Sequence, residues 1–424
     1  MIALVMTIGV GGGTEDGILF SIKKIKPNEI TFLVTNESNE KLESLLEKIS
    51  SNFSIKISKK ILLDNEKENL QSCYEKAKEA IEALLEKNYR EDEIYTDFTF
   101  GTKPMAAGLI SASIFKQIKS CIYITGSKRD KDGGKVISGT EELTMIEPRL
   151  IFDDYNFSDF KKFFNSYQFN SARDALHKIS NFFFHDEHED KRSIYENFLN
   201  AYSYWDKFNY QESQNCFYKV IDKNRVRFIS SIDHDKVALN SDFVRKLNNK
   251  INSNKKYPKS LIIDIFENSL RREEEGKYDD ALIRLYRVVE LISQNLLFEE
   301  YNFDVSDVTS ENASRLDASM RERYLQTKDK YKNKKVTTTG LSANFEILDY
   351  FKCDFIKKYS KDLKFRNALG KRNCSILTHN TKPINIDDFN ILRNSVSNMV
   401  FDFFGGKDNY NMTASKVKMA KFSV

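Results

Sequence analysis

The stretch that decides the fold of the first part of the chain is IALVMTIGVGGGTEDGILFSIKKI, residues 2–25. It opens with a continuous apolar run, which is typical of a buried strand, and passes through a glycine-rich loop at residues 9–13. A helical pattern follows over residues 14–25. Strand, loop and helix in this order make the first part of a βα unit.

The same alternation continues to about residue 150. Further strands are predicted at residues 29–35, 55–63, 94–97 and 121–125, and helices at 41–50, 67–87 and 104–116. Repeated βα units favour a mostly parallel, doubly wound, Rossmann-like sheet with helices on both faces. We expect this α/β domain to end near residue 150, after an edge hairpin across Gly133-Gly134.

Beyond residue 152 the strand pattern stops and an all-α region is predicted. Helices are expected at residues 160–180, 193–201, 211–222, 279–297 and 386–404, the last one ended by Gly405-Gly406. The segments WDKFNY (205–210) and EGKYDD (275–280) each precede a helix, which indicates an internal helix-turn-helix repeat. Residues 306–339 are polar, with a basic run at 328–335, and we expect a mobile insertion there.

The composition is that of a soluble globular protein of two or three domains: 424 residues, 40% hydrophobic and 30% charged. A net charge of +4 does not favour a non-specific nucleic-acid coat, so nucleic-acid binding is expected in a local pocket or groove. Five scattered cysteines without CxxC spacing predict reduced thiols, no zinc site and a cytoplasmic location. The apolar start lacks a basic region and a cleavage site, and no apolar run predicts a membrane partner.

Two loops at strand ends are candidate phosphate sites. The loop at residues 7–14 lets an anion approach backbone amides at a helix start, but Thr14 replaces the third glycine of a dinucleotide fingerprint. The loop TDFTFGTKPM (96–105) offers the hydroxyls of Thr99 and Thr102 and the charge of Lys103. Ligands of open α/β sheets bind at this end of the strands. The alternatives are a tight glycine turn without ligand, and threonines that only cap the helix.

The stretch KRNCSILTH, residues 371–379, holds the candidate catalytic pair. Arg372 and His379 are seven residues apart, about 700° on a helix, so one helix face would carry both. We expect this helix to end near residue 382, before Pro383. A fixed cation beside a group that titrates near pH 7 suits metal-free phosphodiester cleavage. The alternative is a chance pairing on a solvated helix face.

Other candidates are weaker. His185-Asp186-Glu187-His188-Glu189-Asp190 contains possible metal ligands, but without a third ligand cluster it is interpreted as an exposed acidic loop. His234 is interpreted as part of a polar turn. Arg366-Asn367 and Arg393-Asn394 lack a histidine at helical distance downstream and serve as internal controls, and Arg284 and Glu290 are interpreted as a helix-surface charge set.

These motifs together resemble a known family. Thr7-Ile8-Gly9 with its glycine-rich continuation, and Asp97-Phe98-Thr99 followed by Gly101-Thr102-Lys103 and Met105, resemble the CARF sensor domain of type III CRISPR systems. Arg372-Asn373 with His379 resembles the Arg-polar-x(4–6)-His signature of HEPN ribonucleases, and residues 281–290 are similar to an early HEPN helix. Sensor first and nuclease last is the order in ancillary CRISPR ribonucleases of the Csm-six and Csx-one type. Phe100 departs from the pattern, where many relatives have glycine.

The resemblance implies a homodimeric, cyclic-oligoadenylate-activated single-stranded RNA endoribonuclease of antiviral defence that needs no metal and binds no DNA stably. It implies a CARF sensor at 1–150, a helical connector at 151–257 and a HEPN ribonuclease at 258–424. Cyclic tetra-adenylate is favoured over hexa-adenylate as activator, and slow cleavage of the activator by the sensor is a further hypothesis. The implied catalytic residues are Arg372, Asn373 and His379, and the implied ligand-binding residues are Gly9, Gly11, Gly12, Gly13, Thr14, Thr99, Gly101, Thr102 and Lys103.

The resemblance also implies the chemistry. RNA carries its own nucleophile, the 2′-hydroxyl, so His379 would transfer protons and Arg372 would stabilise the phosphorane charge. The products would be 2′,3′-cyclic phosphate and 5′-hydroxyl ends. Two other hypotheses stay open: a catalytically inactive sensor or dimerisation module, and a metal-dependent CARF-linked DNA nuclease.

Overall fold

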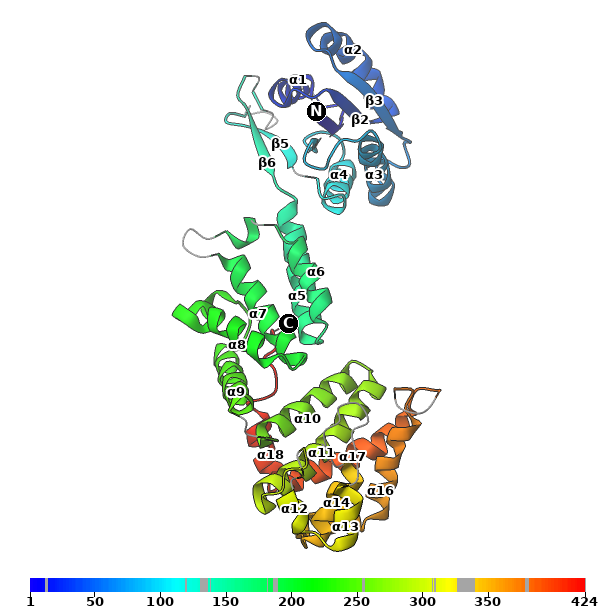
Figure 1. Ribbon diagram of the computed structural model, residues 1–424. Helices are drawn as coiled ribbons and strands as arrows, with labels where there is room; N and C mark the ends of the chain where they lie inside the picture. Colours follow the sequence, from blue (N-terminus) through cyan, green and yellow to red (C-terminus); the bar gives the residue numbers. More distant parts are fainter. Residues whose placement is uncertain are drawn as a thin grey trace. The chain divides into compact units, whose positions relative to one another are not determined.

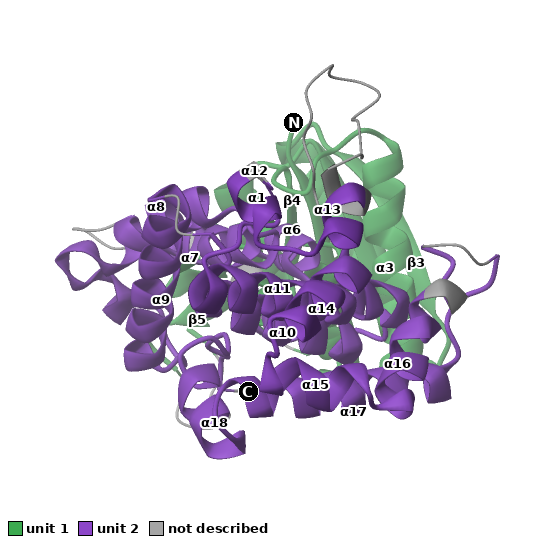
Figure 2. Cartoon of the chain, turned by 60° about the horizontal axis from the view of Figure 1, so that its bottom comes forward, with its two compact units in different colours: residues 1–158, 177–183 green, residues 159–176, 184–424 purple. Residues whose placement is uncertain are grey.

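The computed structural model describes residues 1–11, 14–118, 120–129, 136–137, 139–180, 182–185, 190–253, 256–306, 308, 310–325, 340–377 and 381–423. The chain divides into two compact units (Figure 2). Unit 1 contains Met1–Ser158 and His177–Phe183, and unit 2 contains Asp159–Leu176 and Phe184–Val424.

The described part of unit 1 is built on a six-stranded sheet in the order β3-β2-β1-β4-β5-β6. The five strands β1 to β5 are parallel, and β6 pairs antiparallel with β5. This confirms the predicted doubly wound α/β fold. The bounds are β1 Ala3–Thr7, β2 Glu29–Thr35, β3 Lys56–Leu62, β4 Ile94–Asp97, β5 Ser120–Gly126 and β6 Glu141–Ile146. Gly133-Gly134, where the hairpin turn was predicted, lies outside the described residues.

Helices cover both faces of this sheet (Figure 1). Because successive side chains of a strand point to opposite faces, Leu4 and Met6 of β1 join one apolar core, with α1 and α2. Ala3 and Val5 join the other core, with α3 and α4. The bounds are α1 Thr14–Ile25, α2 Asn36–Asn52, α3 Leu70–Glu86 and α4 Lys103–Phe115. Helix α2 starts five residues before the predicted residue 41, because Thr35 and Ser38 form a capping box.

Unit 2 is helical, and α5 and α6 are shared between the two units. The helices are α5 Arg149–Asn165, α6 Phe169–Lys178, α7 Lys191–Asp206, α8 Tyr210–Ile221, α9 His234–Asn252, α10 Lys259–Glu274, α11 Tyr278–Tyr301, α12 Ser310–Ser314, α13 Ala318–Leu325, α14 Leu341–Tyr350, α15 Asp354–Ser360, α16 Leu363–Gly370, α17 Ile386–Phe403 and α18 Lys407–Ala414, with 3₁₀ segments η1 Phe182–Phe184, η2 Asp222–Phe228 and η3 Lys371–Cys374. The described part of the chain contains no helix that is both long and apolar enough to span a bilayer.

One tight turn recurs between consecutive helices. Tyr167, Phe208, Gly276 and Lys352 all adopt positive φ, between 60° and 73°. In each turn the residue after them donates its N–H to a carbonyl five residues back, as Asn209 does to Tyr204 and Lys277 does to Arg272. The two segments that indicated an internal repeat therefore share one turn geometry. The turn at Tyr167 also separates α5 from α6, so the single helix predicted at 160–180 was wrong.

The polar stretch at residues 306–339 is partly structured, unlike the expected insertion. It contains α12 and α13, whose apolar side chains Ala313 and Met320 are buried together with Leu316 between them. The basic run at 328–335 lies outside the described residues.

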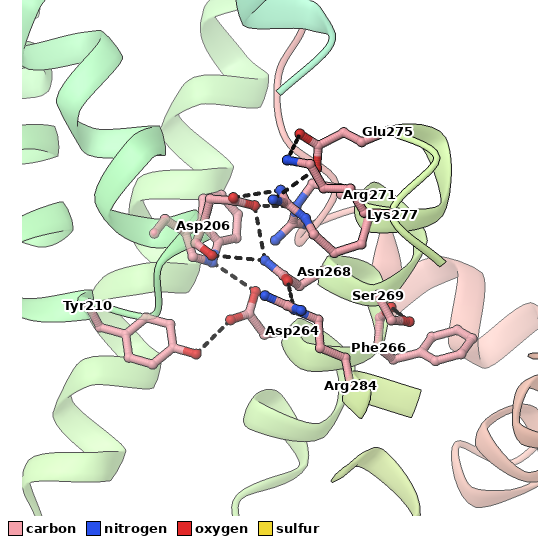
Figure 3. Close-up of polar contacts among 12 residues, drawn as sticks. Asp206, Tyr210, Asp264, Phe266, Asn268, Ser269, Arg271, Glu275, Lys277 and Arg284 are labelled. Atoms are coloured by element: carbon pink, nitrogen blue, oxygen red, sulfur yellow. Dashed lines mark hydrogen bonds and ion pairs between the residues drawn. The ribbon is translucent and has the colours of Figure 1, made fainter. Parts of the chain in front are cut away.

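A buried polar network joins the α7–α8 hairpin to the α10–α11 hairpin within unit 2 (Figure 3). Asp206 accepts bonds from Arg271 Nε at 3.0 Å and Arg272 Nη2 at 2.6 Å. Asp264 accepts bonds from Trp205 Nε1 at 2.8 Å and the Tyr210 hydroxyl at 2.7 Å. Each carboxylate thus has donors from another element, as a buried charge requires.

Arg284 belongs to the same network (Figure 3). Its Nε donates to Asn268 Oδ1 at 2.5 Å, and Asn268 in turn donates to Asp206. Arg284 also pairs along its helix with Asp280, as expected of a helix-surface charge set, so it joins the helix surface to the buried network. Glu290 pairs along the same helix with Arg287 at 3.0 Å.

The last residues of the chain pack against the helices α5, α7 and α9. Phe422, 4% exposed, contacts the rings of Phe160, Phe164 and Phe198. Asn165 exchanges two bonds with the Phe422 backbone, at 2.7 and 2.9 Å. The chain therefore returns, after α18, to the helices that follow the sheet domain.

Candidate sensor and nuclease sites

The two candidate ligand loops lie side by side. The sheet order places β1 next to β4, and Met6 is paired with Asp97 at their carboxyl ends. Strand order reverses between these two strands, so the loops flank the topological switch point, the usual ligand site of open α/β sheets. A Cβ added to Gly9 would lie 2.9 Å from the Gly101 backbone nitrogen. The glycines therefore let the two loops touch backbone to backbone.

A pocket of about 420 Å³ opens at this point. Five of the predicted ligand residues line it: Gly9, Gly11, Thr14, Gly101 and Thr102. Gly12 and Gly13 lie outside the described residues. A second pocket, of about 430 Å³, shares Gly9, Gly11 and Thr14 and extends to α1 and α2. The predicted loops thus form a continuous pair of pockets in unit 1.

Thr99 and Lys103 do not line either pocket. The Thr99 hydroxyl donates to Asp97 Oδ1 at 2.5 Å and accepts from the Ile124 N–H at 2.8 Å. Burial raises the pKa of the Asp97 carboxyl, and bonds from Thr99 and Ser21 lower it. Thr99 therefore links β4 to β5. Lys103 is exposed at the start of α4, where Thr102 is the N-cap. A ligand role for Thr99 and Lys103 stays a prediction.

Phe100 lines the first pocket. Its ring packs on α1, where a Cβ added to Gly17 would lie 2.4 Å from Phe100 Cζ. Gly17 therefore provides the space for the aromatic ring that this sequence carries in place of glycine.

Two lysines near these pockets were missed by the sequence analysis. Lys67, in the loop after β3, lines the first pocket, and its carbonyl accepts a 2.8 Å bond from the Thr102 hydroxyl. Lys41, on α2, lines the second pocket and bonds the Val10 carbonyl. Lys67 lies five residues beyond the end of β3, so its place in the sequence did not by itself mark it as a pocket residue.

The helix predicted to carry Arg372 and His379 is interrupted. Helix α16 ends at Gly370, Arg372 lies in η3, and Ser375 is extended, with φ −87° and ψ 141°. The continuous helix to residue 382 was therefore wrong. His379 lies outside the described residues, as does the side chain of Asn373. The shared-face geometry cannot come from one regular helix.

Asp279, in the first turn of α11, explains the interruption. Its carboxylate accepts from the Ser375 hydroxyl and, at 3.1 Å, from the Ile384 N–H. Ser375 Oγ also accepts from the Leu377 N–H at 3.2 Å. Such local side-chain bonds compete with helix hydrogen bonds. One carboxylate thereby holds both ends of the segment 375–384, which contains His379.

Arg372 lies over the ring of Tyr286, with its guanidinium carbon 4.2 Å from the ring centroid. This cation–π contact fixes the guanidinium plane. Burial raises the pKa of the Tyr286 phenol, and the Arg372 charge opposes that rise. The phenol is therefore neutral near pH 7. Both residues line an open groove of about 570 Å³ between α14 and α16.

The remaining sequence candidates are placed as follows. Within His185–Asp190, Glu187 and its neighbours 186, 188 and 189 lie outside the described residues, while Asp190 caps α7. His234 begins α9 and its Nε2 lies 2.9 Å from the Ile229 carbonyl oxygen. Arg393 bonds Glu273 at 3.2 Å. In the described ranges, no cluster of three or more His, Cys, Asp or Glu is arranged to hold a metal ion.

Comparisons with known proteins decide the family. A family model described as the Csm6 6H domain matches residues 152–255, and one described as the Csm6 HEPN domain matches residues 249–401. The chain belongs to the Csm6 family of CARF–HEPN ribonucleases. The second match contains Arg372 and His379. A search of curated proteins found no match.

One solved structure agrees with this fold over nearly the whole chain. Csm6 from Enterococcus italicus, bound to cyclic hexa-2′-fluoro-hexa-dAMP, is similar with a TM-score of 0.60 and 14% identity, over 98% of this chain and 99% of that chain. Can2 from Sulfobacillus thermosulfidooxidans, in complex with cyclic tetra-adenylate, gives a TM-score of only 0.24 at 14% identity, over 49% of this chain and 67% of that chain. The similarity to the first structure extends over both units of this Csm6 protein.

Proposed function

We propose that this Csm6 protein is a cyclic-oligoadenylate-activated, metal-independent endoribonuclease for single-stranded RNA in type III CRISPR defence. One observation carries the proposal: the Csm6 HEPN match contains the Arg372–His379 motif, and Arg372 is held at the edge of an open groove. The domain division 1–150, 151–257 and 258–424 belongs to the same proposal.

The catalytic chemistry needs no external nucleophile. The RNA 2′-hydroxyl attacks the adjacent phosphate, and His379 exchanges protons with this hydroxyl or with the leaving 5′-oxygen. Arg372 donates its fork of N–H groups to the phosphorane oxygens, and Asn373 donates a further hydrogen bond. The products carry 2′,3′-cyclic phosphate and 5′-hydroxyl ends. Because Tyr286 already fixes the Arg372 guanidinium, little reorganisation is needed at the moment of reaction.

A second copy of the chain completes the site in this proposal. Apolar side chains near the Arg372 segment are exposed on α16, on the segment after η3 and on α17, namely Leu363, Ile376, Leu377, Ile386 and Ile391. A twofold homodimer would bury these side chains and bring two Arg372–His379 pairs together.

The activator binds in the unit 1 pockets in this proposal. Gly9, Gly11 and Gly101 line this space together with Thr14 and Thr102, and Lys67 adds a positive charge. Cyclic tetra-adenylate remains the predicted ring, and the E. italicus structure, with its hexanucleotide analogue, makes cyclic hexa-adenylate the ring to test beside it. Slow cleavage of the activator in this pocket also remains a prediction.

The test is cleavage of labelled RNA with cyclic tetra-adenylate, with cyclic hexa-adenylate and with neither, each with and without EDTA. We expect one ring to activate, EDTA to have no effect, and Arg372→Ala and His379→Ala to abolish cleavage. Lys371→Ala is the matched control, because Lys371 is the neighbouring cation and pairs with Asp388 at 2.8 Å. Full activity of His379→Ala would refute the site.

The same assay separates the alternative functions. Tight binding of a ring without any RNA loss would indicate a sensor or dimerisation module. Cleavage of DNA that EDTA abolishes would indicate a metal-dependent nuclease. Linear products from the ring in the His379→Ala protein would show activator cleavage by unit 1.

A further inference from the structure

The groove beside Arg372 has features that the cleavage chemistry does not use. Its walls are α14 and the α15–α16 segment, and its volume is about 570 Å³, within the roughly 300–1,000 Å³ of small-molecule sites. Besides Tyr286 and Arg372, it is lined by Phe345, Glu346, Asp349, Lys361 and Arg366. We refer to it as the α14–α16 groove. Stabilising one phosphorane requires Arg372 but none of these other five side chains.

Arg366 and Lys361 add two positive charges to the lining of the groove. Both are exposed, and both line the same cavity as Arg372. Arg366 was an internal control in the sequence analysis, because no histidine follows it at helical distance. The fold instead places Arg366, which is six residues before Arg372 in the chain, on the same groove. An RNA strand whose scissile phosphate meets Arg372 would bring a neighbouring phosphate within reach of Arg366.

Phe345 provides a surface for a base. It lies on α14, is half-buried, and lines the groove opposite the arginine-bearing α16 segment. Bases of single-stranded nucleic acids commonly stack on aromatic side chains, and each such stack contributes appreciably to affinity.

Glu346 and Asp349 identify the kind of base. Both are exposed carboxylates on α14, beside Phe345, and in a groove for RNA they would repel the backbone. Carboxylates accept hydrogen bonds from the exocyclic amines of bases, whereas uracil presents a carbonyl in the corresponding position. Their presence therefore favours a base with an exocyclic amine, namely adenine, cytosine or guanine, over uracil.

We propose that the α14–α16 groove binds the nucleotide next to the scissile phosphate, with Arg366 on its phosphate, Phe345 on its base, and Glu346 and Asp349 selecting a base with an exocyclic amine over uracil. This proposal rests on the proposed ribonuclease function and names the substrate preference of that site. Only binding is involved, so no bond is made or broken in the groove.

The test uses oligonucleotides of 2′-deoxynucleotides with a single ribonucleotide, because only that position carries the nucleophile. The base on either side of the cleavage point is varied among adenine, cytosine, guanine and uracil. The full-length protein is assayed with cyclic tetra-adenylate and, separately, with cyclic hexa-adenylate. On one side, adenine, cytosine and guanine should each be preferred over uracil by about tenfold in kcat/KM. The Glu346→Gln/Asp349→Asn double variant should lose that preference while it still cleaves.

Arg366→Ala should raise KM about tenfold with kcat within twofold. For binding of a 2′-O-methyl RNA, which cannot be cleaved, it should reduce the slope of log affinity against log salt by about 0.7, the share of one phosphate contact in a single strand. Lys364→Ala is the matched control. Lys364 is an exposed cation on the same helix that does not line the groove, so its removal should change neither quantity.

The groove proposal is overturned if Arg366→Ala behaves as Lys364→Ala does, or if the double variant keeps the wild-type base preference. Either result leaves RNA cleavage itself intact. Loss of the ribonuclease function is recognised differently, by a wild-type protein that cleaves no RNA or by full activity of Arg372→Ala.

Discussion

Removal of the Asp279 carboxylate tests whether the nuclease segment depends on a residue that is distant in sequence. Asp279 accepts from Ser375 Oγ and from the Ile384 N–H, 96 and 105 residues away. In Asp279→Ala both ends of the segment 375–384 lose this attachment. We therefore expect a catalytic defect without contact between Asp279 and the substrate.

The magnitude follows from these two bonds. A hydrogen bond to a charged group contributes about 1.5–3 kcal/mol, and Asp279 is only half-buried, so the lower value applies to each. Their sum, about 3 kcal/mol, corresponds to a loss of about 100-fold in kcat/KM if the segment must be ordered for the reaction. Asp279→Asn keeps a neutral acceptor, so about a tenfold loss is expected.

Asp280→Ala is the control. Asp280 is the next residue in the same first turn, so both variants remove one acidic group near the helix N-terminus. Asp280 instead forms a half-exposed ion pair with Arg284, and such pairs contribute about 0–1 kcal/mol. The kcat/KM of Asp280→Ala should therefore stay within about threefold of the wild-type value.

The assay is RNA cleavage under activating conditions, with circular dichroism and thermal unfolding to establish that each variant folds. Ser375→Ala removes one of the two hydrogen bonds and should lower kcat/KM about tenfold. In a protein that already carries Asp279→Ala, the same substitution should lower kcat/KM little further. Equal activity of folded Asp279→Ala and Asp280→Ala would refute the reasoning. If Asp279→Ala does not fold, the comparison of Asp279→Asn and Ser375→Ala with wild type decides it.

Three further predictions concern other parts of the molecule. Burial raises the pKa of Asp264 to about 6, whereas an unfolded aspartate has a pKa of about 4. The stabilising contribution of Asp264 is therefore present below about pH 4 and is lost as the pH rises to about 6. In Asp264→Asn the unfolding midpoint should no longer show this pH dependence. If the unfolding midpoint of wild type and of Asp264→Asn changed with pH in the same way between about pH 4 and 6, the prediction would be wrong. Phe422→Ala should destabilise unit 2 by about 3–5 kcal/mol in denaturant titrations, and Met412→Ala, at an exposed position, is the control. An unchanged unfolding midpoint of Phe422→Ala would show that the C-terminal residues do not contribute to the stability of unit 2. Gly9→Ala should lower the thermal stability of unit 1 more than Gly11→Ala does. The added Cβ would lie 2.9 Å from Gly101 N at position 9, but 3.8 Å from Thr14 Oγ1 at position 11. The reverse order of stabilities would contradict the close packing of the two loops.

The sheet domain was predictable because its signals are local. The bounds of β2, β4 and α1 are those expected from the apolar runs and the helical pattern alone. The adjacency of the two candidate ligand loops also followed, since carboxyl ends of parallel strands meet at one edge of a sheet. Lys67 and Lys41 were missed because a lysine in a loop or on a helix carries no local mark of the pocket it lines.

The nuclease segment was predicted in its motif but not in its conformation. The spacing of Arg372 and His379 suggested one helix, and nothing local contradicts that over residues 371–377. The helix ends because Ser375 bonds a carboxylate on another helix, a tertiary contact that overrides local propensity. The burial of the residues after α18 was missed for a similar reason. Val417, Met419 and Phe422 become a recognisable apolar set only when α5, α7 and α9 are present to cover them.

The sequence predicted one helix that would place Arg372 and His379 on the same face, but the structure positions this candidate segment through contacts with helix α11. Asp279 and Tyr286 are seven residues apart on it, about 700° and about 10.5 Å along the axis, so they project from one face two turns apart. One holds the ends of the segment with His379, and the other holds the Arg372 guanidinium. The apolar stripe of α11, with Leu282, Leu285 and Val289 at 0% exposure, fixes this helix in the core of unit 2. The spacing that positions this segment is therefore the seven residues between Asp279 and Tyr286 on α11, and not the seven residues between Arg372 and His379. The segment that carries the proposed catalytic motif need not be helical, because α11 holds it at Asp279 and at Tyr286.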